Sequence, residues 1–196
     1  MTTGIPPGPL PPSPLDLLSA SEVTIIISQM APKGKQKTTY VAVIGGGQVN
    51  HEVADLARRL GQELARRGAV VICGGLGGVM EAVAQGVKEA NGVCLGILPD
   101  PDRRRANPYL SFSIATNMGH ARNVIIVHSA DALIAVDGSY GTISEAAVAL
   151  KLGKPVIGLM TSWNLPGMQH AADVLEAVAL ALAENEKRRL GHRPES

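Results

Sequence analysis

Aromatic side chains are scarce in this sequence, at 3% of 196 residues, and only two cysteines occur, Cys73 and Cys94. Both cysteines lie at or near the ends of apolar runs, so we interpret them as reduced core residues in a reducing compartment. The two cysteines and five histidines show no spacing typical of a metal site. We therefore expect no metal ion held directly by side chains.

The sequence also lacks an excess of charge of either sign and lacks long apolar segments. The formal net charge is +1, far from the basic surplus of a general nucleic-acid binder, which argues against nucleic acid as a partner. No apolar stretch reaches the ~20 residues of a membrane span, and no basic and apolar leader begins the chain. We expect a cytoplasmic protein without a membrane partner.

Composition divides the chain into three stretches. Residues 1–38 are a Pro-rich N-terminal tail and linker, with a candidate edge strand in the β-branched run Val23–Ile27. Residues 39–190 alternate short apolar runs with helical periodicity, which is typical of βα units around a parallel sheet. Residues 191–196 form a C-terminal tail. The predicted fold class is α/β, a Rossmann-like single domain whose parallel sheet is flanked by helices.

Short apolar runs mark the expected strands, and helical patterns lie between them. The expected strands are Tyr40–Ile44, Val70–Cys73, Val93–Leu98, Phe112–Ala115, Ala132–Val136 and, as the last clear strand, Pro155–Leu159. A terminal helix from Ala171 to about Arg189 is expected to carry its apolar side chains on one face. These are Val174, Leu175, Val178 and Leu182. A polar loop over residues 99–108, which contains Arg103–Arg105, is expected to be mobile.

Three glycine-rich loops each stand between a predicted strand and a predicted helix. Their candidate ligand-binding residues are Gly45 and Gly46; Gly74, Gly75, Gly77 and Gly78; and Gly138, Ser139, Tyr140, Gly141 and Thr142. Helix N-termini attract anions, and glycine lets a ligand approach the backbone. Since parallel sheets bind ligands at the carboxyl ends of their strands, we predict that these loops hold the phosphate of a nucleotide or nucleotide-like ligand. The glycines of the first loop are equally consistent with a tight turn alone.

A dinucleotide site fits the second loop less well. Gly75 and Gly77 begin the dinucleotide fingerprint, but Met80 stands where the third glycine would allow close helix packing. Asp100 lies at a plausible spacing for a ribose-binding acid, yet it stands between two prolines and is equally suited to capping a turn.

Three motifs resemble those of the LONELY GUY (LOG) superfamily, whose members are often mislabelled lysine decarboxylases. They are Gly74–Glu81, Gly119–Asn123 and Gly138–Glu145, and the resemblance covers residues 41–159. Within the superfamily the chain is most similar to the branch with molybdenum-cofactor carrier proteins and uncharacterised bacterial members related to the DNA-processing proteins DprA and Smf. No strong lysine motif for pyridoxal phosphate is present, so we do not expect a lysine decarboxylase.

The resemblance implies a homodimer or homotetramer that cleaves the N-glycosidic bond of nucleoside 5′-monophosphates, releasing the base and ribose 5-phosphate. Arg122 matches the catalytic arginine of the family, and Glu145 matches the glutamate that closes its glycine motif. The chain departs from the family pattern at three positions. It has Asp137 where the enzymes usually have proline, Ser139 where they have glycine, and Asn123 where they commonly have lysine. The alternative is a non-catalytic carrier or sensor for a nucleotide or the molybdenum cofactor. Either function has a small phosphorylated ligand as its partner, and the hydrolysis requires no cofactor.

The chemistry of glycoside cleavage suits this pair of residues. Positive charge builds on the ribose, and a carboxylate such as Glu145 would stabilise it and position a water, while the guanidinium of Arg122 would hold the carboxylate or a ligand oxygen. Each residue also has a plainer interpretation: Glu145 as an acid in the first turn of its helix, and Arg122 as a solvated side chain. His120 is set aside, because a single histidine in a turn is more often structural. DNA binding through Arg103–Arg105 is a weaker third option.

Overall fold

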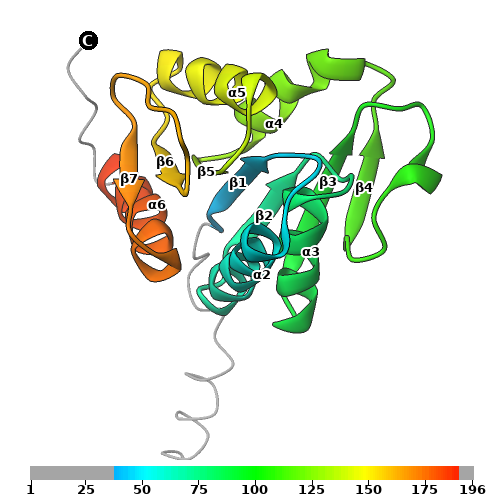
Figure 1. Cartoon of the computed structure of the whole chain (residues 1–196), viewed down its shortest axis with the longest axis horizontal. Helices are drawn as coiled ribbons and strands as arrows, with labels where there is room; N and C mark the ends of the chain where they lie inside the picture. The colour runs from blue at the N-terminus through cyan, green and yellow to red at the C-terminus, as the bar shows by residue number, and fades with distance from the viewer. Residues whose placement is uncertain (1–37, 190–196) are drawn as a thin grey trace, which may run out of the picture. The chain divides into compact units, whose positions relative to one another are not determined.

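A computed structural model of the chain describes residues 38–189 (Figure 1). Its strands are all parallel and form one sheet in the order β4-β3-β2-β1-β5-β6-β7. The strands are β1 (Tyr40–Gly45), β2 (Val70–Cys73), β3 (Val93–Leu98), β4 (Phe112–Ala115), β5 (Ala132–Val136), β6 (Val156–Leu159) and β7 (Gln169–Ala171). The predicted α/β Rossmann-like fold with a flanked parallel sheet is confirmed.

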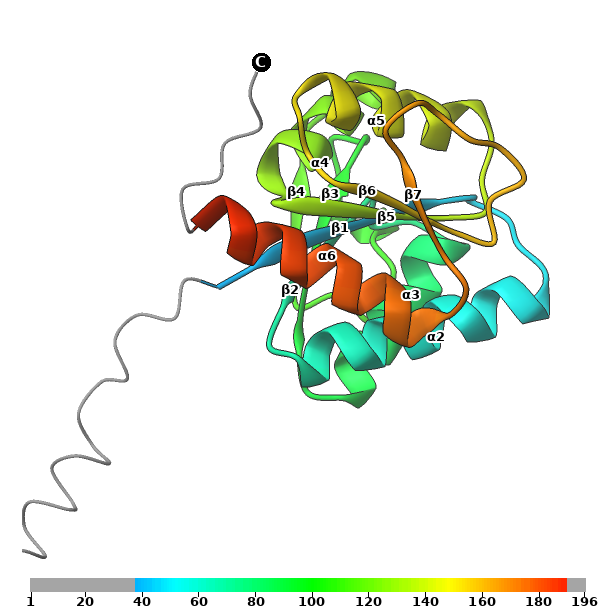
Figure 2. The same cartoon turned by 90° about the vertical axis from the view of Figure 1, so that its left-hand side faces the viewer.

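Helices cover both faces of this sheet. They are α2 (His51–Arg66), α3 (Val79–Glu89), α4 (Asn123–Ser129), α5 (Tyr140–Lys151) and α6 (Val174–Arg189), with short 3-10 helices η1 (Arg103–Arg105) and η2 (Gly119–Arg122). Figure 2 shows α2, α3 and α6 on one side of the sheet and α4 and α5 on the other. The domain therefore has three layers. No helix in the stretch 38–189 is long and apolar enough to cross a membrane.

Alternate side chains of each strand enter two separate cores. In β1, Val41 and Val43 pack with α2, α3 and α6, whereas Ala42 and Ile44 pack with α4 and α5. All four are at most 2% exposed. A strand that is buried on both faces reads as a continuous apolar run, which is why the strand positions could be read from the sequence.

The strand order creates a crevice beside the central strand. β1 pairs with β2 on one side and with β5 on the other, and the chain reaches β5 only after it has built β2, β3 and β4 outward in one direction. The helices that follow β1 and β5 leave toward opposite faces of the sheet. A gap therefore opens at the carboxyl ends of β1 and β5, which is the usual ligand position in open α/β sheets.

Close packing of α2 against α3 depends on two glycines. A Cβ atom at Gly86 would lie far inside van der Waals contact with the carbonyl oxygen of Arg58, and one at Gly61 would overlap the carbonyl oxygen of Val83. At the edge of this contact the Arg58 Nη1 atom lies 3.2 Å from a carboxylate oxygen of Glu89. The two backbones thus touch directly, and this contact leaves no room for a side chain at either glycine.

Two predictions about the C-terminal part of the chain are wrong. The terminal helix begins at Val174 and not at Ala171, because Gln169–Ala171 forms a seventh strand parallel to β6. This edge strand has three residues and no apolar pattern, so nothing in its sequence signalled it. In α6, Leu175 is 59% exposed, whereas Ala177 and Ala181 are fully buried. Small alanines face the sheet there, and a prediction based on large apolar side chains overlooked them.

The candidate edge strand Val23–Ile27 and the C-terminal tail 191–196 lie outside the described residues.

Candidate functional site

A cavity of about 250 Å³ opens at the carboxyl ends of β1, β2 and β5. The loops that follow these strands can be traced in Figure 1. Residues from four separated segments line the cavity: Val43, Ile44, Gly45, Gly46 and Gly47; Gly74, Leu76 and Met80; His120, Arg122 and Asn123; and Ser139, Gly141, Thr142 and Glu145. Eight of the predicted site residues are among them: Gly45, Gly46, Gly74, Arg122, Ser139, Gly141, Thr142 and Glu145.

Arg122 is held firmly at the start of α4. Its residue is only 8% exposed, Nη2 donates a hydrogen bond of 3.2 Å to the carbonyl oxygen of Gly74, and Nη1 donates one of 2.7 Å to Oδ1 of Asn123. The buried Nε has no partner within the described part of the chain. Burial lowers the pKa of the guanidinium, and the charge of Glu145 opposes this shift. The interpretation of Arg122 as a solvated side chain is therefore wrong.

Gly74 makes room for this arginine. A Cβ atom at residue 74 would lie 2.5 Å from Nη2 of Arg122 and 2.5 Å from Sδ of Met80. A larger residue would push the guanidinium away from the end of β2. Gly74 thus allows the Arg122 side chain to lie where it does, and it also leaves the backbone accessible from the cavity.

Glu145 lies inside the cavity wall and not at the helix end. Because α5 begins at Tyr140, Glu145 is in its second turn, and the prediction of a first-turn position is wrong. The residue is 7% exposed, and Oε1 lies 4.0 Å from Nη1 of Arg122. No residue of the described chain donates a hydrogen bond to this carboxylate. Burial raises the pKa of Glu145 to about 7, although Arg122 acts in the opposite direction.

Asn123 explains why the arginine and the glutamate are not paired more closely. The same Nη1 atom that faces Glu145 at 4.0 Å donates to Oδ1 of Asn123 at 2.7 Å. Asn123 therefore competes with Glu145 for the guanidinium of Arg122. The negative charge of the Glu145 carboxylate is then only partly balanced by the charge of Arg122. Sequence reasoning noted Asn123 as a departure from the family pattern but missed this role, since the contact depends on side-chain geometry.

The first-turn amides of α5 have no side-chain cap. Ser139 is its N-cap residue, but the Ser139 side chain makes no capping hydrogen bond, whereas Oδ1 of Asn50 caps α2 by accepting from the Val53 amide at 2.9 Å. The Thr142 residue is 4% exposed, and no hydrogen bond to its hydroxyl occurs within residues 38–189. Unoccupied first-turn amides beside a free hydroxyl are the features of an anion site.

The loop that precedes α5 is strained and anchored. Asp137 and Gly138 both have positive φ, at 48° and 92°, and a left-handed aspartate is an uncommon, unfavourable conformation. The Trp163 Nε1 atom donates a hydrogen bond of 3.1 Å to the carbonyl oxygen of Gly138. A Cβ atom at Gly138 would overlap the Thr142 side chain. Trp163 was missed from sequence, where its only signal is that it is the sole tryptophan.

Five predicted ligand residues lie outside the cavity lining: Gly75, Gly77, Gly78, Gly138 and Tyr140. Tyr140 is 88% exposed. Gly75 has a positive φ and packs against Leu98, and Gly78, also with positive φ, lies against the backbone of Gly46. These glycines shape the loops around the cavity. In their place the structure brings in Gly47, Leu76, Met80, Asn123 and His120, which had been set aside.

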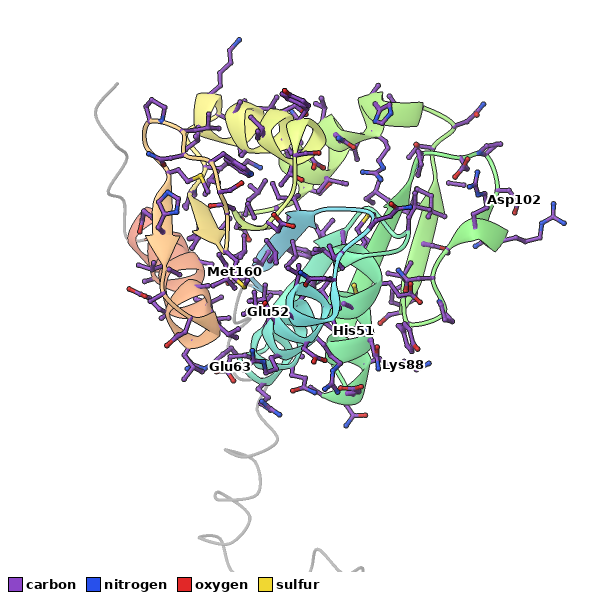
Figure 3. The ribbon with its side chains drawn as sticks, viewed as in Figure 1. His51, Glu52, Glu63, Lys88, Asp102 and Met160 are labelled. Atoms are coloured by element: carbon purple, nitrogen blue, oxygen red, sulfur yellow. The ribbon has the colours of Figure 1, made fainter. Side chains whose placement is uncertain are left out.

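The polar loop after β3 is attached to the glycine loop after β2. Asn107, 9% exposed, donates from its backbone to the carbonyl oxygen of Gly75 and from Nδ2 to that of Leu76, both at 3.0 Å. Asp100 pairs with Arg105 at 3.1 Å, so one oxygen of its carboxylate contacts a side chain of the same loop. Asp102, labelled in Figure 3, lies on the outer part of this loop.

The histidines, cysteines and acidic residues of the described chain form no metal site. Within residues 38–189, no group of three or more His, Cys, Asp or Glu side chains is arranged to hold a metal ion. Cys73 and Cys94 are free and buried, with their Sγ atoms 3.9 Å apart. They are core residues, as predicted.

A second cavity of about 510 Å³ lies between the N-terminal parts of α2 and α3. It shares Gly47 with the first cavity. The remaining lining residues are Gln48, Val49, Asn50, His51, Ala54, Gly78, Glu81, Ala82 and Gln85.

Two solved structures are similar to the chain along almost their whole length. A molybdenum cofactor binding protein from the phototrophic bacterium Rippkaea orientalis is 34% identical with a TM-score of 0.72, over 76% of this chain and 98% of that one. A Moco carrier protein from Chlamydomonas reinhardtii is 32% identical with a TM-score of 0.69, over 78% of this chain and 99% of that one. The predicted resemblance to the carrier branch is confirmed.

Proteins with similar sequences include one that matches along almost its whole length and one that matches over less than half of its length. An uncharacterized protein from Archaeoglobus fulgidus is 47% identical over 151 residues, which are 77% of this chain and 99% of that one. A cytokinin riboside 5′-monophosphate phosphoribohydrolase from Arabidopsis thaliana is 38% identical over 95 residues, 47% of this chain and 42% of that one. The SLOG cluster4 family model matches residues 38–188. The chain belongs to the SLOG cluster4 family.

Proposed function

We propose that this chain binds the molybdenum cofactor, or a closely similar phosphorylated ligand, in the cavity between β1, β5 and α5, and that it holds this ligand as a carrier without cleaving it. The similarity to the Rippkaea orientalis molybdenum cofactor binding protein over 98% of that chain carries this proposal. The match to the Arabidopsis phosphoribohydrolase spans 47% of this chain, so a carrier is the better supported of the two functions.

The cavity contains the groups that a phosphorylated ligand requires. The first-turn amides of α5 and the Thr142 hydroxyl provide hydrogen-bond donors. Arg122 adds a positive charge and a buried Nε–H without a partner among the described residues. A single arginine and a helix N-terminus suit a phosphate monoester, and the low dielectric of a buried site strengthens both interactions.

Glu145 can take the protonated or the ionised form near neutral pH, and each form suits one of the two functions. With a pKa of about 7, close to half of the Glu145 side chains are protonated at neutral pH. A protonated carboxyl donates a hydrogen bond to an anionic ligand, whereas an ionised carboxylate repels it. Charge stabilisation during glycoside cleavage requires the ionised form, which the burial of Glu145 and the competition of Asn123 for Arg122 disfavour.

Cofactor loading tests the proposal directly. Molybdenum cofactor released anaerobically from a molybdenum enzyme is mixed with the purified chain, and molybdenum is quantified in the protein peak after gel filtration. We expect close to one molybdenum per chain. Thr142→Val removes one hydroxyl from the cavity at constant volume and is expected to lower the bound fraction at limiting cofactor.

Thr161→Val is the matched control for this experiment. The Thr161 hydroxyl is buried and has no partner in the described residues, and Thr161 does not line the cavity. The control is expected to load like the natural chain. Absence of molybdenum from the natural protein's peak refutes the proposal that this chain carries the molybdenum cofactor.

Hydrolysis of nucleoside 5′-monophosphates is the second candidate function. Its support is that Arg122 and Glu145, which match the family's catalytic pair, lie 4.0 Å apart in one buried cavity. Glu145 would stabilise the positive ribose after ionisation and would orient the attacking water. Chromatographic detection of free base from a panel of monophosphates tests this function. Release that is lost in Glu145→Gln supports it, and no release from any member of the panel refutes it.

A further inference from the structure

Asn123 contacts the arginine of the site through its amide oxygen. The guanidinium of Arg122 has N–H donors and no acceptor, so the oxygen of the Asn123 amide, and not its nitrogen, must face Nη1 at the observed distance of 2.7 Å. A hydrogen bond from a charged donor is stronger than one between neutral groups. The charge of Arg122 therefore fixes the orientation of the Asn123 side chain.

This contact leaves three polar groups at the cavity without a protein partner. The amide nitrogen Nδ2 of Asn123 makes no hydrogen bond within residues 38–189. The buried Nε of Arg122 has no acceptor in the same stretch, and no group there donates a hydrogen bond to the Glu145 carboxylate. All three residues line the cavity. A buried group without a partner carries a desolvation cost, which an anion bound at Nε would remove.

Without the Asn123 oxygen, Arg122 would have a different partner. Its Nη1 atom lies 4.0 Å from Oε1 of Glu145, about 1 Å beyond hydrogen-bond distance, so a small movement of either side chain closes the gap. A closed arginine–carboxylate pair uses the donors that an anion requires and balances their charge within the protein. The cavity would then offer less attraction to a phosphorylated ligand.

We propose that Asn123 is a positioning residue: by accepting the hydrogen bond from Nη1 it keeps Arg122 from pairing with Glu145, and the guanidinium stays open to an anionic ligand. The ligand part of this inference rests on the proposed function, because it takes a phosphorylated ligand as bound in this cavity. The part that concerns the ligand-free chain does not depend on it.

The titration of Glu145 in the ligand-free chain reports this role. The carboxyl carbon of Glu145 is followed by ¹³C NMR over an acid-to-alkaline pH series, and its signal is identified by its loss in Glu145→Gln. The natural chain is expected to titrate with a midpoint of about 7. Asn123→Leu has a side chain of similar size but no acceptor. Arg122 then pairs with Glu145, and the midpoint is expected to fall by about one pH unit or more.

Asn123→Asp separates positioning from a general disturbance of the site. Aspartate keeps an acceptor oxygen beside Nη1 and binds Arg122 more strongly, so the Glu145 midpoint is expected to stay near 7 or to rise. A merely structural role of Asn123 would move the midpoint in the same direction in both variants. Asn164→Leu is the matched control, because Oδ1 of Asn164 lies 2.9 Å from Nε2 of His170 and Asn164 does not line the cavity. Its midpoint is expected to equal that of the natural chain.

Other ionisable groups near the pair are the same in all of these proteins. His120 is the one further titratable side chain among the described residues that line the cavity. Cys73 in β2 and Asp100 in the loop after β3 act on the charge of Arg122. Because none of them is altered, a difference between the Glu145 midpoints reports the residue at position 123.

Cofactor loading then tests whether the open guanidinium serves the ligand. At neutral pH, Asn123→Leu is expected to need on the order of tenfold more protein than the natural chain to retain the same amount of molybdenum cofactor, because the loss of a hydrogen bond to a charged group is of about this size. Asn164→Leu is expected to load like the natural chain.

The outcomes separate this inference from the proposed function. An unchanged Glu145 midpoint in folded Asn123→Leu, or a midpoint near the ordinary value of 4.5 in the natural chain, overturns the positioning role whatever the cofactor does. A lowered midpoint with unchanged loading overturns the link between the open guanidinium and the ligand. If the natural chain retains no molybdenum, the proposed function fails and the ligand part fails with it, and the titrations still decide the role of Asn123.

Discussion

The buried carboxyl of Glu145 should make the stability of this protein depend on pH. Its pKa rises from an ordinary value of 4.5 to about 7 in the folded chain. A carboxyl with a raised pKa contributes its full stability below pH 4.5, and that contribution is lost as the pH rises to 7. The loss across this window amounts to about 3 kcal/mol, at ~1.36 kcal/mol for each pH unit.

Replacement of Glu145 by glutamine isolates this contribution, because glutamine keeps the size and polarity of the side chain but cannot ionise. Urea unfolding of the natural chain and Glu145→Gln is measured without ligand at pH 4.5, 6 and 8. The free-energy difference between the two proteins is expected to shift by about 3 kcal/mol in favour of the variant from the lowest to the highest pH. This is roughly 1.5 M in the urea midpoint at an m value of about 2 kcal/mol/M.

Ionisations elsewhere in the chain cancel in this comparison, and Glu52→Gln on the surface of α2 controls for the chemical change itself. A free-energy difference that stays constant within about 0.5 kcal/mol from pH 4.5 to 8 would refute the reasoning, since the expected change is several times larger. Such a result would mean that Glu145 is ionised in the folded chain near its ordinary pKa. The protonated form would then be rare at neutral pH, and Glu145 would not donate a hydrogen bond to an anionic ligand.

Three further predictions concern packing and anchoring. Gly86→Ala should lower the free energy of unfolding by about 1–3 kcal/mol, because its methyl group overlaps the Arg58 carbonyl; an unchanged urea midpoint contradicts this. Lys154→Met should lower the thermal midpoint by several degrees, since Nζ donates to three carbonyl oxygens at the end of α4 at 2.6–2.9 Å; calorimetry checks it. Trp163→Phe keeps an aromatic ring but removes the hydrogen bond to Gly138. We expect weaker ligand binding and a loss of about 1 kcal/mol in the free energy of unfolding. An unchanged affinity would show that this hydrogen bond is dispensable for binding.

The fold could be read from the sequence wherever burial is uniform along a segment. The predicted bounds of β2, β3, β4 and β5 agree with the structure. Three of these strands are buried on both faces, and β4, whose Phe112 and Ile114 are at least half exposed, was recognised from its residue types. β7 was not predicted, because its three residues have no apolar pattern, and Leu175 was wrongly placed on the buried face of α6, because alanines form that face.

The candidate site could be read only in part. Shared motifs pointed to Arg122 and Glu145, and the structure brings both into one cavity. The same glycine pattern did not distinguish Gly74, which faces the cavity, from Gly75, which packs against Leu98. Neighbouring glycines have the same chemical identity, and their roles depend on which segment lies opposite each of them.

The sequence by itself determined that glycine loops end parallel strands and that an arginine and a glutamate accompany them, because strand periodicity and motif spacing are properties of neighbouring residues. Only the tertiary structure decided the environment of that pair. Asn123 draws Arg122 away from Glu145, and burial between β1 and α5 raises the pKa of the carboxyl. These effects depend on distances between segments that lie far apart in the chain, which no local pattern encodes.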